Sequence, residues 1–219
     1  MQGRRQVLTE LSASHIRAAV QSFYYDEIDS TNNEARRLLE QGRIADAAWV
    51  LARGQTSGRG TRGRVWVSPV GAGLCLSVVH SARNVRWPVT TTFTKSAAVA
   101  CVEVLREVTG ATVRIRPIND LMIDGRKLGG ILTETVVAAD RVEAVITGIG
   151  INVRTAPTLT GDDRRATTCL AALATGPVYD DRAVRDLAER IARRVDARHR
   201  QVFTGDIAEI ERLECDFRE

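Results

Sequence analysis

The sequence predicts an α+β fold in which a mixed, largely antiparallel β-sheet packs with helices. Strand-like apolar runs and amphipathic helical stripes alternate irregularly along the chain. Asp124-Gly125 lies between two apolar runs, which is a strong signal for a two-residue hairpin between antiparallel strands. The run 73–79 is almost continuously apolar, as expected for a strand covered on both faces of a sheet.

The first expected elements are a strand at 23–25 and a helix that starts near Thr31 and ends at Gly42. Thr31 and Glu34 match the capping box that often opens a helix. The hydroxyl groups of Ser30 and Thr31 can therefore cap this helix, or they can point at a small polar ligand. From this segment alone, capping is favoured.

The other expected elements follow from apolar periodicity and from turn residues between the runs. The strands are expected at 47–52, 73–79, 112–116, 121–123, 127–136 and 142–153. The helices are expected at 93–108, 180–200 and 207–213. Residues 1–22 are expected to form a polar tail with a short helix, and residues 23–219 a single domain.

The composition limits the classes of function that the chain can have. With 219 residues, 44% of them hydrophobic, the chain can bury its own core. A net charge of +4 favours phosphates or acidic partners but is too small to indicate nucleic-acid binding. No apolar run reaches membrane-spanning length, and no signal peptide is visible. The cysteines are expected to be buried thiols in a reducing compartment, hence a cytoplasmic protein: Cys75, Cys101, Cys169 and Cys215.

The segment 55–69 carries the clearest signal for a ligand site. Glycines and arginines alternate at Gly58, Arg59, Gly60, Arg62, Gly63 and Arg64. Glycines free the backbone to turn and expose N–H groups, and arginines add forked cationic donors, so the segment predicts an anion-binding loop. The G-x-G-x-x-G spacing does not indicate a dinucleotide fold, because a strand-like run ending in Pro69 follows where a helix is required.

Glycines also interrupt two expected strands. Gly130 follows Lys127, and Gly148 and Gly150 precede Asn152 on one face of the next strand. A glycine inside a strand usually indicates the close approach of a neighbouring backbone or of a ligand. A lysine beside such a position is a candidate partner for phosphate or carboxylate.

These pieces, in this order, resemble the catalytic domain of biotin–protein ligases, in the biotin/lipoate protein ligase superfamily. The matching runs are 29–32, 55–69, 119–121, 125–132 and 148–153. The resemblance implies the family's catalytic fold, which is like that of class II aminoacyl-tRNA synthetases. The chain is expected to lack the winged-helix domain and the C-terminal β-barrel domain found in relatives.

The resemblance implies an ATP-dependent, AMP-forming biotin–[acetyl-CoA-carboxylase] ligase. Biotin and MgATP would give biotinoyl-5′-AMP, from which a lysine of a biotin carboxyl carrier protein takes the biotin. ATP and Mg²⁺ are the implied cofactors. No DNA or membrane partner is expected, and a homodimer is compatible with the family.

The resemblance also implies which residues form the site. The biotin contacts would be Ser30, Thr31, Gln55, Gly58, Arg59, Lys127, Gly130, Gly148 and Gly150. The nucleotide contacts would be Arg64, Trp66, Asn119, Asp120 and Asn152, with Asp120 also a candidate metal ligand. Lys127, Arg59 and Arg64 would be catalytic, because a carboxylate attacking an α-phosphate needs cations already in place.

Two stretches differ from the family pattern. Arg116-Pro117-Ile118 stands where Lys-Trp-Pro is usual, and Thr61 stands where an arginine is common. Thr61 implies one fewer cation over the adenylate, and therefore weaker retention of it. Two alternatives stay open: a lipoate or octanoate ligase on the same fold, and a non-catalytic domain that binds a vitamin or nucleotide.

Overall fold

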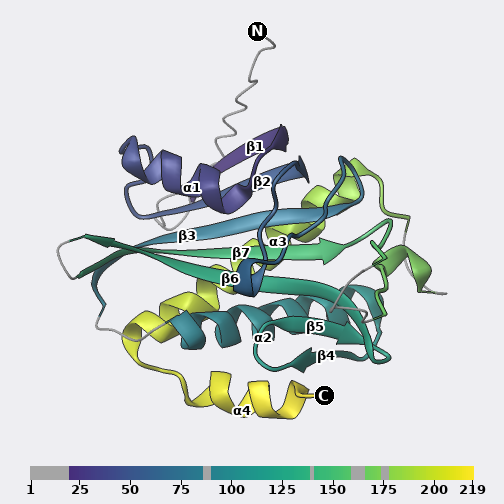
Figure 1. The fold of residues 1–219 in the computed structure, drawn as a ribbon. Helices are drawn as coiled ribbons and strands as arrows, with labels where there is room; N and C mark the ends of the chain where they lie inside the picture. The colour runs from purple at the N-terminus through teal and green to yellow at the C-terminus, as the bar shows by residue number, and fades with distance from the viewer. Residues whose placement is uncertain (1–19, 86–89, 139–140, 159–165, 174–177) are drawn as a thin grey trace, which may run out of the picture.

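The computed structural model describes residues 20–85, 90–138, 141–158, 166–173 and 178–219. The strands of this part of the chain form one seven-stranded sheet in the order β1-β2-β3-β7-β6-β5-β4 (Figure 1). They are β1 (Gln21–Ile28), β2 (Ala47–Gln55), β3 (Gly73–Val85), β4 (Val113–Arg116), β5 (Asp120–Ile123), β6 (Arg126–Ala138) and β7 (Arg141–Asn152). Only β1 and β2 are parallel neighbours, so the mixed, largely antiparallel sheet is confirmed.

The expected helices are also present, with ends shifted by a few residues. They are α1 (Thr31–Glu40), α2 (Thr90–Thr109), α3 (Asp181–Thr204) and α4 (Ala208–Phe217). Most of the expected N-terminal tail and helix lies outside the described residues, and β1 already begins at Gln21. None of the described helices is long and apolar enough to cross a membrane.

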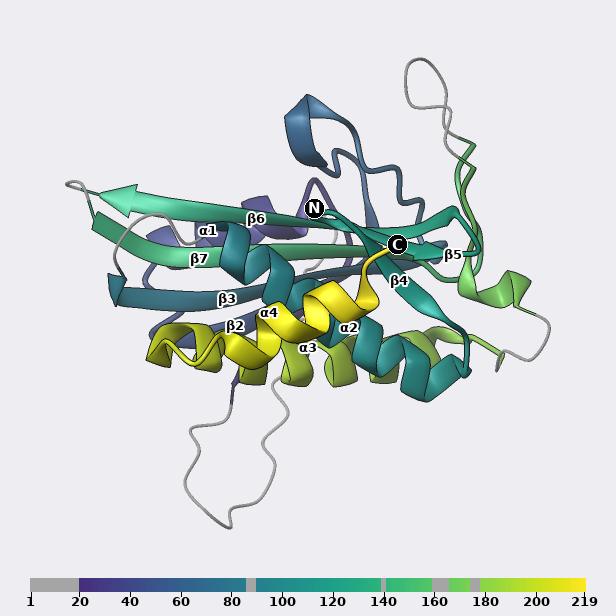
Figure 2. The same ribbon diagram turned by 90° about the horizontal axis from the view of Figure 1, so that it is seen from below.

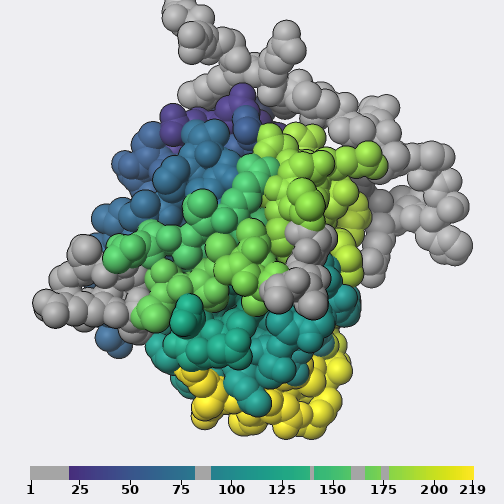
Figure 3. Space-filling model, turned by 90° about the vertical axis from the view of Figure 1, so that its right-hand side faces the viewer, coloured from purple at the N-terminus to yellow at the C-terminus, as the bar shows by residue number. Residues whose placement is uncertain are grey.

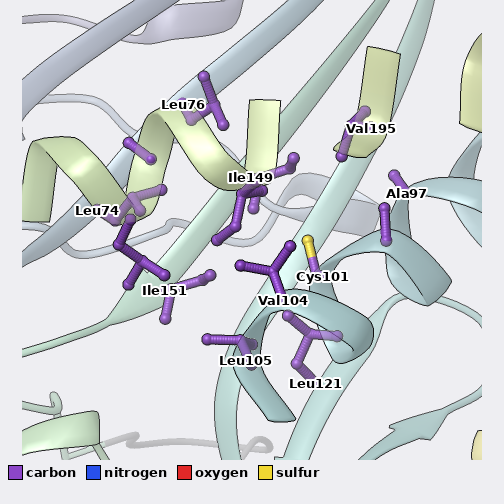
Figure 4. Close-up of a cluster of buried hydrophobic side chains, with 14 of the residues drawn as sticks. Leu74, Leu76, Ala97, Cys101, Val104, Leu105, Leu121, Ile149, Ile151 and Val195 are labelled. Atoms are coloured by element: carbon purple, nitrogen blue, oxygen red, sulfur yellow. The ribbon is translucent and has the colours of Figure 1, made fainter. Parts of the chain in front are cut away.

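One face of the sheet carries the larger core. Figure 2 shows α2, α3 and α4 together on this side of the sheet. Figure 4 shows side chains from the sheet and from α2 and α3 turned toward one another, including Leu74, Leu76, Ile149, Ile151, Cys101, Leu105 and Val195. Burying a large apolar side chain contributes about 1.5–3 kcal/mol. This face therefore supplies most of the stabilisation, and the opposite face can stay partly open.

The opposite face carries a smaller core under α1. Ala35 and Leu38 of α1 pack with Val50 of β2 and Ile146 of β7. Because side chains alternate along a strand, the residues after Ile146 on this face are Gly148, Gly150 and Asn152. Beyond α1, this face of β7 therefore carries few bulky side chains. The segment between β2 and β3 rises over that surface, on the side away from α2, α3 and α4 (Figure 2).

The hairpin that brings Lys127 to this region is confirmed. Asp124 and Gly125 have φ angles of 48° and 68°, the left-handed values that a type I′ turn requires at both central residues. The turn joins β5 to β6, and Lys127 pairs with Met122 across it.

The prediction of a capping box at the start of α1 is wrong. Ser30 is the N-cap residue, and its side chain makes no capping bond. The hydroxyl of Thr31 donates to the amide oxygen of Gln55, 3.1 Å away, and Glu34 accepts from the hydroxyl of Tyr25 at 2.7 Å. Glu34 also pairs with Arg37 at 2.8 Å, so neither side chain caps the helix.

The prediction of four buried cysteines is wrong at one position. Cys75, Cys101 and Cys169 are buried, whereas Cys215 is exposed. Cys215 directly follows Glu214, which is one of the residues on the buried side of α4. One step along a helix turns a side chain by about 100°, so Cys215 points to solvent.

Candidate functional site

A cleft lies on the open face of the sheet, between the start of α1, strands β6 and β7, and the basic loop 55–69. It encloses about 840 Å³, part of it open to solvent, which is the size of a small-molecule site. Its walls combine segments far apart in the sequence. Figure 3 shows the green segment that includes β7 between the blue N-terminal part and the teal part of the chain.

The residues that line the cleft come from segments far apart in the sequence. They are Ser30, Thr31, Asn32, Gln55, Arg59, Gly60, Thr61, Arg64, Val65, Trp66, Val67, Asn119, Lys127, Gly130, Ile131, Leu132, Gly148, Ile149, Gly150, Asn152, Pro157 and Thr167. Every site residue expected from the sequence is among them except Gly58 and Asp120, and each of these two contacts a lining residue, Trp66 and Lys127 respectively.

The basic loop folds back on itself over the cleft. Trp66 donates its backbone N–H to the carbonyl of Gly58, and Gly60 donates to the carbonyl of Arg64, both at 2.8 Å. An isolated bridge also pairs Arg59 with Val65. The strand-like pattern at 65–67 therefore forms bridges within the loop and no regular strand. The loop turns at Gly63, whose φ of 72° favours glycine.

Trp66 connects the loop to the floor of the cleft. Its indole lies so close to Gly150 that a Cβ there would overlap the ring. A Cβ on Gly130 would be 3.6 Å from the same ring, an ordinary contact. The ammonium of Lys127 is 5.9 Å from the ring centroid, within range of a cation–π interaction. The glycine at 150 therefore makes room for Trp66.

Two other glycines also make room for protein groups. A Cβ on Gly148 would overlap the side-chain amide of Asn32, and a Cβ on Gly58 would overlap the carbonyl oxygen of Trp66. Among these glycines of the cleft, Gly130 is the one where an added Cβ would make only ordinary contacts. Gly58, Gly148 and Gly150 shape the cleft through the side chains and backbone that they admit.

The two cations nearest the floor have acidic partners. Lys127 Nζ is 2.8 Å from Asp120 Oδ1, and the two side chains are only 13% and 8% exposed. Arg59 Nη2 is 2.6 Å from Glu134 Oε2, in a more exposed pair. Arg64 lines the cleft on the same side. Carboxylates thus already fix the orientation of two cations at the cleft, Lys127 and Arg59.

Polar contacts fix the end of the cleft beside α1. Both the backbone N–H and the hydroxyl of Thr31 donate to Gln55 Oε1, at 2.7 and 3.1 Å. The backbone N–H of Gln55 in turn donates to the carbonyl of Ser68, at 2.9 Å. The start of the helix and both ends of the basic loop are therefore connected.

The opposite end is fixed by two asparagines. Asn119 donates to the carbonyl of Ile131 at 3.2 Å, and Asn152 donates to the carbonyl of Thr168 at 3.0 Å. A short bridge also pairs Lys127 with Thr167. These bonds hold the 166–168 segment against the start of β6, where Thr167 completes the wall.

Cys75, the cysteine next to the basic loop, is not equipped to act as a covalent nucleophile. Cys75 lies behind the loop with its sulfur 2.9 Å from the hydroxyl oxygen of Ser68. Burial raises the pKa of Cys75 to about 11, so its thiol stays protonated and inert near neutral pH. The cleft is equipped to bind and orient anions.

The residues offer little to a metal ion. Within the described ranges, no three His, Cys, Asp or Glu side chains form a cluster that could hold one. Asp120 supplies a single carboxylate, and Lys127 already contacts it. Mg²⁺ in nucleotide sites commonly takes one or two carboxylates and completes its shell with phosphates and water. Asp120 fits at most one position of such a shell.

Several residues of the site were not predicted from the sequence. Asn32, Ile131, Leu132, Pro157 and Thr167 line the cleft. Leu132 and Glu134 could have been found, because they alternate with Gly130 along one face of β6. Thr167 gave no such signal, since a long connection brings it to Lys127.

Comparison with known proteins identifies the family. A model of the biotin/lipoate A/B protein ligase family matches residues 24–152. This chain belongs to that family. The matched range includes all seven strands from β1 to β7, apart from the first residues of β1, and every site residue expected from the sequence.

Two curated relatives agree. The bifunctional ligase/repressor BirA of Bacillus subtilis is 37% identical over 149 residues, which cover 68% of this chain and 43% of that protein. The biotin–[acetyl-CoA-carboxylase] ligase of Paracoccus denitrificans is 38% identical over 131 residues, 59% of this chain and 53% of that protein. The matched region thus spans about half the length of these relatives, or somewhat less.

A solved structure shows the same fold. The biotin protein ligase of Leishmania major, in complex with biotinyl-5-AMP, superposes with a TM-score of 0.67 at 22% identity. The match covers 91% of this chain and 81% of that one. The fold class predicted from the sequence is therefore confirmed.

Proposed function

We propose that this protein is an ATP-dependent biotin–protein ligase. In the first step a carboxylate oxygen of biotin attacks the α-phosphorus of ATP, the bond to the β-phosphate oxygen breaks, and pyrophosphate leaves. In the second step a lysine amine of a carrier protein attacks the acyl carbon. The bond to AMP then breaks, and the amine loses a proton as the amide forms.

The observation that carries this proposal is the convergence of Lys127, Arg59 and Arg64 on one cleft beside Trp66. The first step brings two anions together, and cations held in place beforehand offset their repulsion. We assign Lys127 to the position between the carboxylate and the α-phosphate. Asp120 holds its ammonium in place, and Arg59 and Arg64 take the remaining charge.

The two ends of the cleft suit the two substrates. We assign Ser30, Thr31 and Gln55 to the polar ring of biotin, with Gly130 beside its tail. Trp66, Asn119 and Asn152 are assigned to the nucleotide. The expected contacts of Gly58, Gly148 and Gly150 with biotin are proposed to act mainly through the groups that they admit. Any Mg²⁺ is proposed to arrive with ATP, with Asp120 as its one candidate ligand.

The wider assignments are part of the same proposal. The partner of the second step is a biotin carboxyl carrier protein domain, and residues 23–219 act as one catalytic domain. The mildly basic surface suits an acidic partner. A cytoplasmic location and a homodimer are predictions from the sequence that measurements of localisation and mass would check.

The experiment is ATP–pyrophosphate exchange with a panel of acids. Biotin is expected to support exchange, with biotinoyl-5′-AMP detected by mass spectrometry, whereas lipoate and octanoate are not. Lys127→Ala is expected to abolish exchange while the protein stays folded. Exchange with lipoate instead would establish the first alternative. Calorimetric binding of biotin and a non-hydrolysable ATP analogue without any exchange would establish the second.

A further inference from the structure

A chain of hydrogen bonds connects the interior of the sheet to the basic loop. Ser77 of β3 donates to Asn32 Oδ1 at 2.6 Å, and Asn32 Nδ2 donates to Glu134 Oε2 at 2.7 Å. Arg59 donates to that same oxygen of Glu134, at 2.6 Å. Ser77 and Asn32 are buried, whereas Arg59 reaches the surface. The hydrogen bonds therefore run from the buried interior of the sheet to an exposed side chain at the cleft.

Asn32, in the middle of this series of hydrogen bonds, has a fixed position. The amide of Asn32 fills the space that Gly148 leaves by lacking a Cβ. Its nitrogen also approaches the carbonyl of Leu132, at 3.4 Å. An amide with its oxygen and nitrogen both engaged cannot rotate without losing hydrogen bonds. Asn32 therefore fixes the position of the Glu134 carboxylate.

We propose that Glu134 is a positioning residue: it holds Arg59, and through Arg59 the basic loop, over the cleft. The glycines around Arg59 make the loop backbone flexible, so its guanidinium needs a fixed partner. A carboxylate on a strand provides that partner. The part of the proposal that concerns catalysis rests on the proposed ligase reaction, whereas the part that concerns the loop does not.

Because the Arg59–Glu134 ion pair is partly exposed, its loss can be expected to affect catalysis more than stability. The side chains of Arg59 and Glu134 are 41% and 20% exposed. Ion pairs of this kind contribute little to folding. Loss of the ion pair itself should therefore change the thermal midpoint little, and loss of the acceptor for the buried Asn32 amide should account for most of any decrease. A misplaced catalytic cation, in contrast, can lower the rate by up to about 100-fold.

The test compares Glu134→Ala, Glu134→Gln and the matched control Glu107→Ala. Glu107 pairs with Arg194 at 2.9 Å between α2 and α3, on the other face of the sheet. Trypsin cleavage of the folded protein after Arg59, Arg62 and Arg64 is followed by mass spectrometry. Exchange kinetics with biotin and the thermal midpoint are measured on the same samples.

Glu134→Ala is expected to speed cleavage of the loop about two- to fivefold, the ratio that corresponds to a partly exposed ion pair. Its kcat for exchange is expected to fall about tenfold or more, with a smaller change in KM for biotin. Glu134→Gln keeps an acceptor oxygen for Arg59, and is expected to restore most of both quantities. Glu107→Ala is expected to match the unsubstituted protein in both.

Three results would overturn the proposal. The first is a loop in Glu134→Ala that is cleaved no faster than in Glu107→Ala. The second is a kcat within about twofold of the unsubstituted protein. The third is a loss of exchange that only follows a loss of folded protein. If the unsubstituted protein shows no exchange with biotin, the proposed function fails, and loop cleavage alone still decides whether Glu134 holds Arg59.

Discussion

The indole of Trp66 packs against the backbone of Gly150 so closely that a methyl group at position 150 would occupy the same space. This contact joins the basic loop to the central part of the sheet. It also places the ring within 5.9 Å of the Lys127 ammonium. The wall assigned to the nucleotide therefore depends on a backbone position that has no side chain.

Gly150→Ala is expected to displace Trp66 without unfolding the protein, because the loop can move more easily than β7. Stacking of a base on an aromatic ring contributes about 1–3 kcal/mol, so affinity for a non-hydrolysable ATP analogue should fall roughly 5- to 150-fold. Calorimetry in the presence of biotin measures this. Gly130→Ala is the control, since its Cβ would lie 3.6 Å from the ring. Equal nucleotide affinity in Gly150→Ala and the unsubstituted protein would contradict the assignment of Trp66.

Lys127→Ala is expected to have separable effects on activity and stability. Loss of the cation should lower exchange by about 100-fold or more. Loss of the ion pair at a largely buried carboxylate should lower the free energy of unfolding by about 3 kcal/mol. Adding Asp120→Asn should recover much of the stability and none of the activity. Urea unfolding and exchange assays measure both, and recovery of exchange in the double variant would refute the role of Lys127.

Thr61→Arg is expected to retain the adenylate longer. Thr61 lines the cleft, so an arginine there would place a further cation near the phosphate. We expect the half-life of the bound intermediate to rise several-fold, roughly the effect of one partly exposed charge pair. Release of labelled adenylate from the purified complex provides the measurement. Arg62→Ala, a substitution at an exposed position on the same loop, serves as the control. An unchanged release rate in Thr61→Arg would show that position 61 does not face the phosphate.

Stability is expected to fall in mild acid because of His199. Its ring is buried between α3, β3 and α2, where it faces His80 Nδ1 at 3.2 Å and the ring of Phe93. Burial, together with the nearby charge of His80, lowers the pKa of His199 well below its ordinary value. The unfolded chain therefore binds a proton below about pH 6.5 that the folded chain does not.

The stabilisation is thus complete above about pH 6.5 and declines as the pH falls, by at most about 1.4 kcal/mol per pH unit for one proton. Urea unfolding at pH 7.5, 6.5 and 5.5 measures this slope. His199→Gln should flatten it, and an equal slope in that variant would assign the effect to another group. Asp196 does not interfere: burial alone would raise its pKa, but hydrogen bonds from His80 and Arg200 outweigh burial and lower it to about 2.

Local signals in the sequence predicted most of the fold. The Asp124-Gly125 turn was predictable because two adjacent residues determine its geometry. The parallel pairing of β1 with β2 was not, because it depends on how α1 crosses between them. The capping box failed for a related reason. Gln55 and Tyr25 lie near Thr31 and Glu34 only in the folded chain.

In the candidate site, too, features set by local sequence were predictable and features set by contacts between distant segments were not. Lys127, Trp66 and the strand glycines were predictable because their residue types are unusual at those positions. Asn32 and Glu134 resemble ordinary polar residues in the sequence, and their contacts appear only when α1, β6 and the basic loop meet. The glycines were identified correctly as points of close approach, yet the sequence does not say which group approaches. At Gly148 and Gly150 those groups are Asn32 and Trp66.

The pairing of β3 with β7 has a consequence for synthesis on the ribosome. Val78 lies opposite Thr147 and Ser77 opposite Gly148, so the middle of the sheet joins segments made far apart in time. Until β7 has left the exit tunnel, β3 has a bare edge and the nascent chain has no binding pocket. The proposed ligands therefore cannot assist the early stages of folding, and rapid completion of the chain, or a chaperone, is needed to protect that edge.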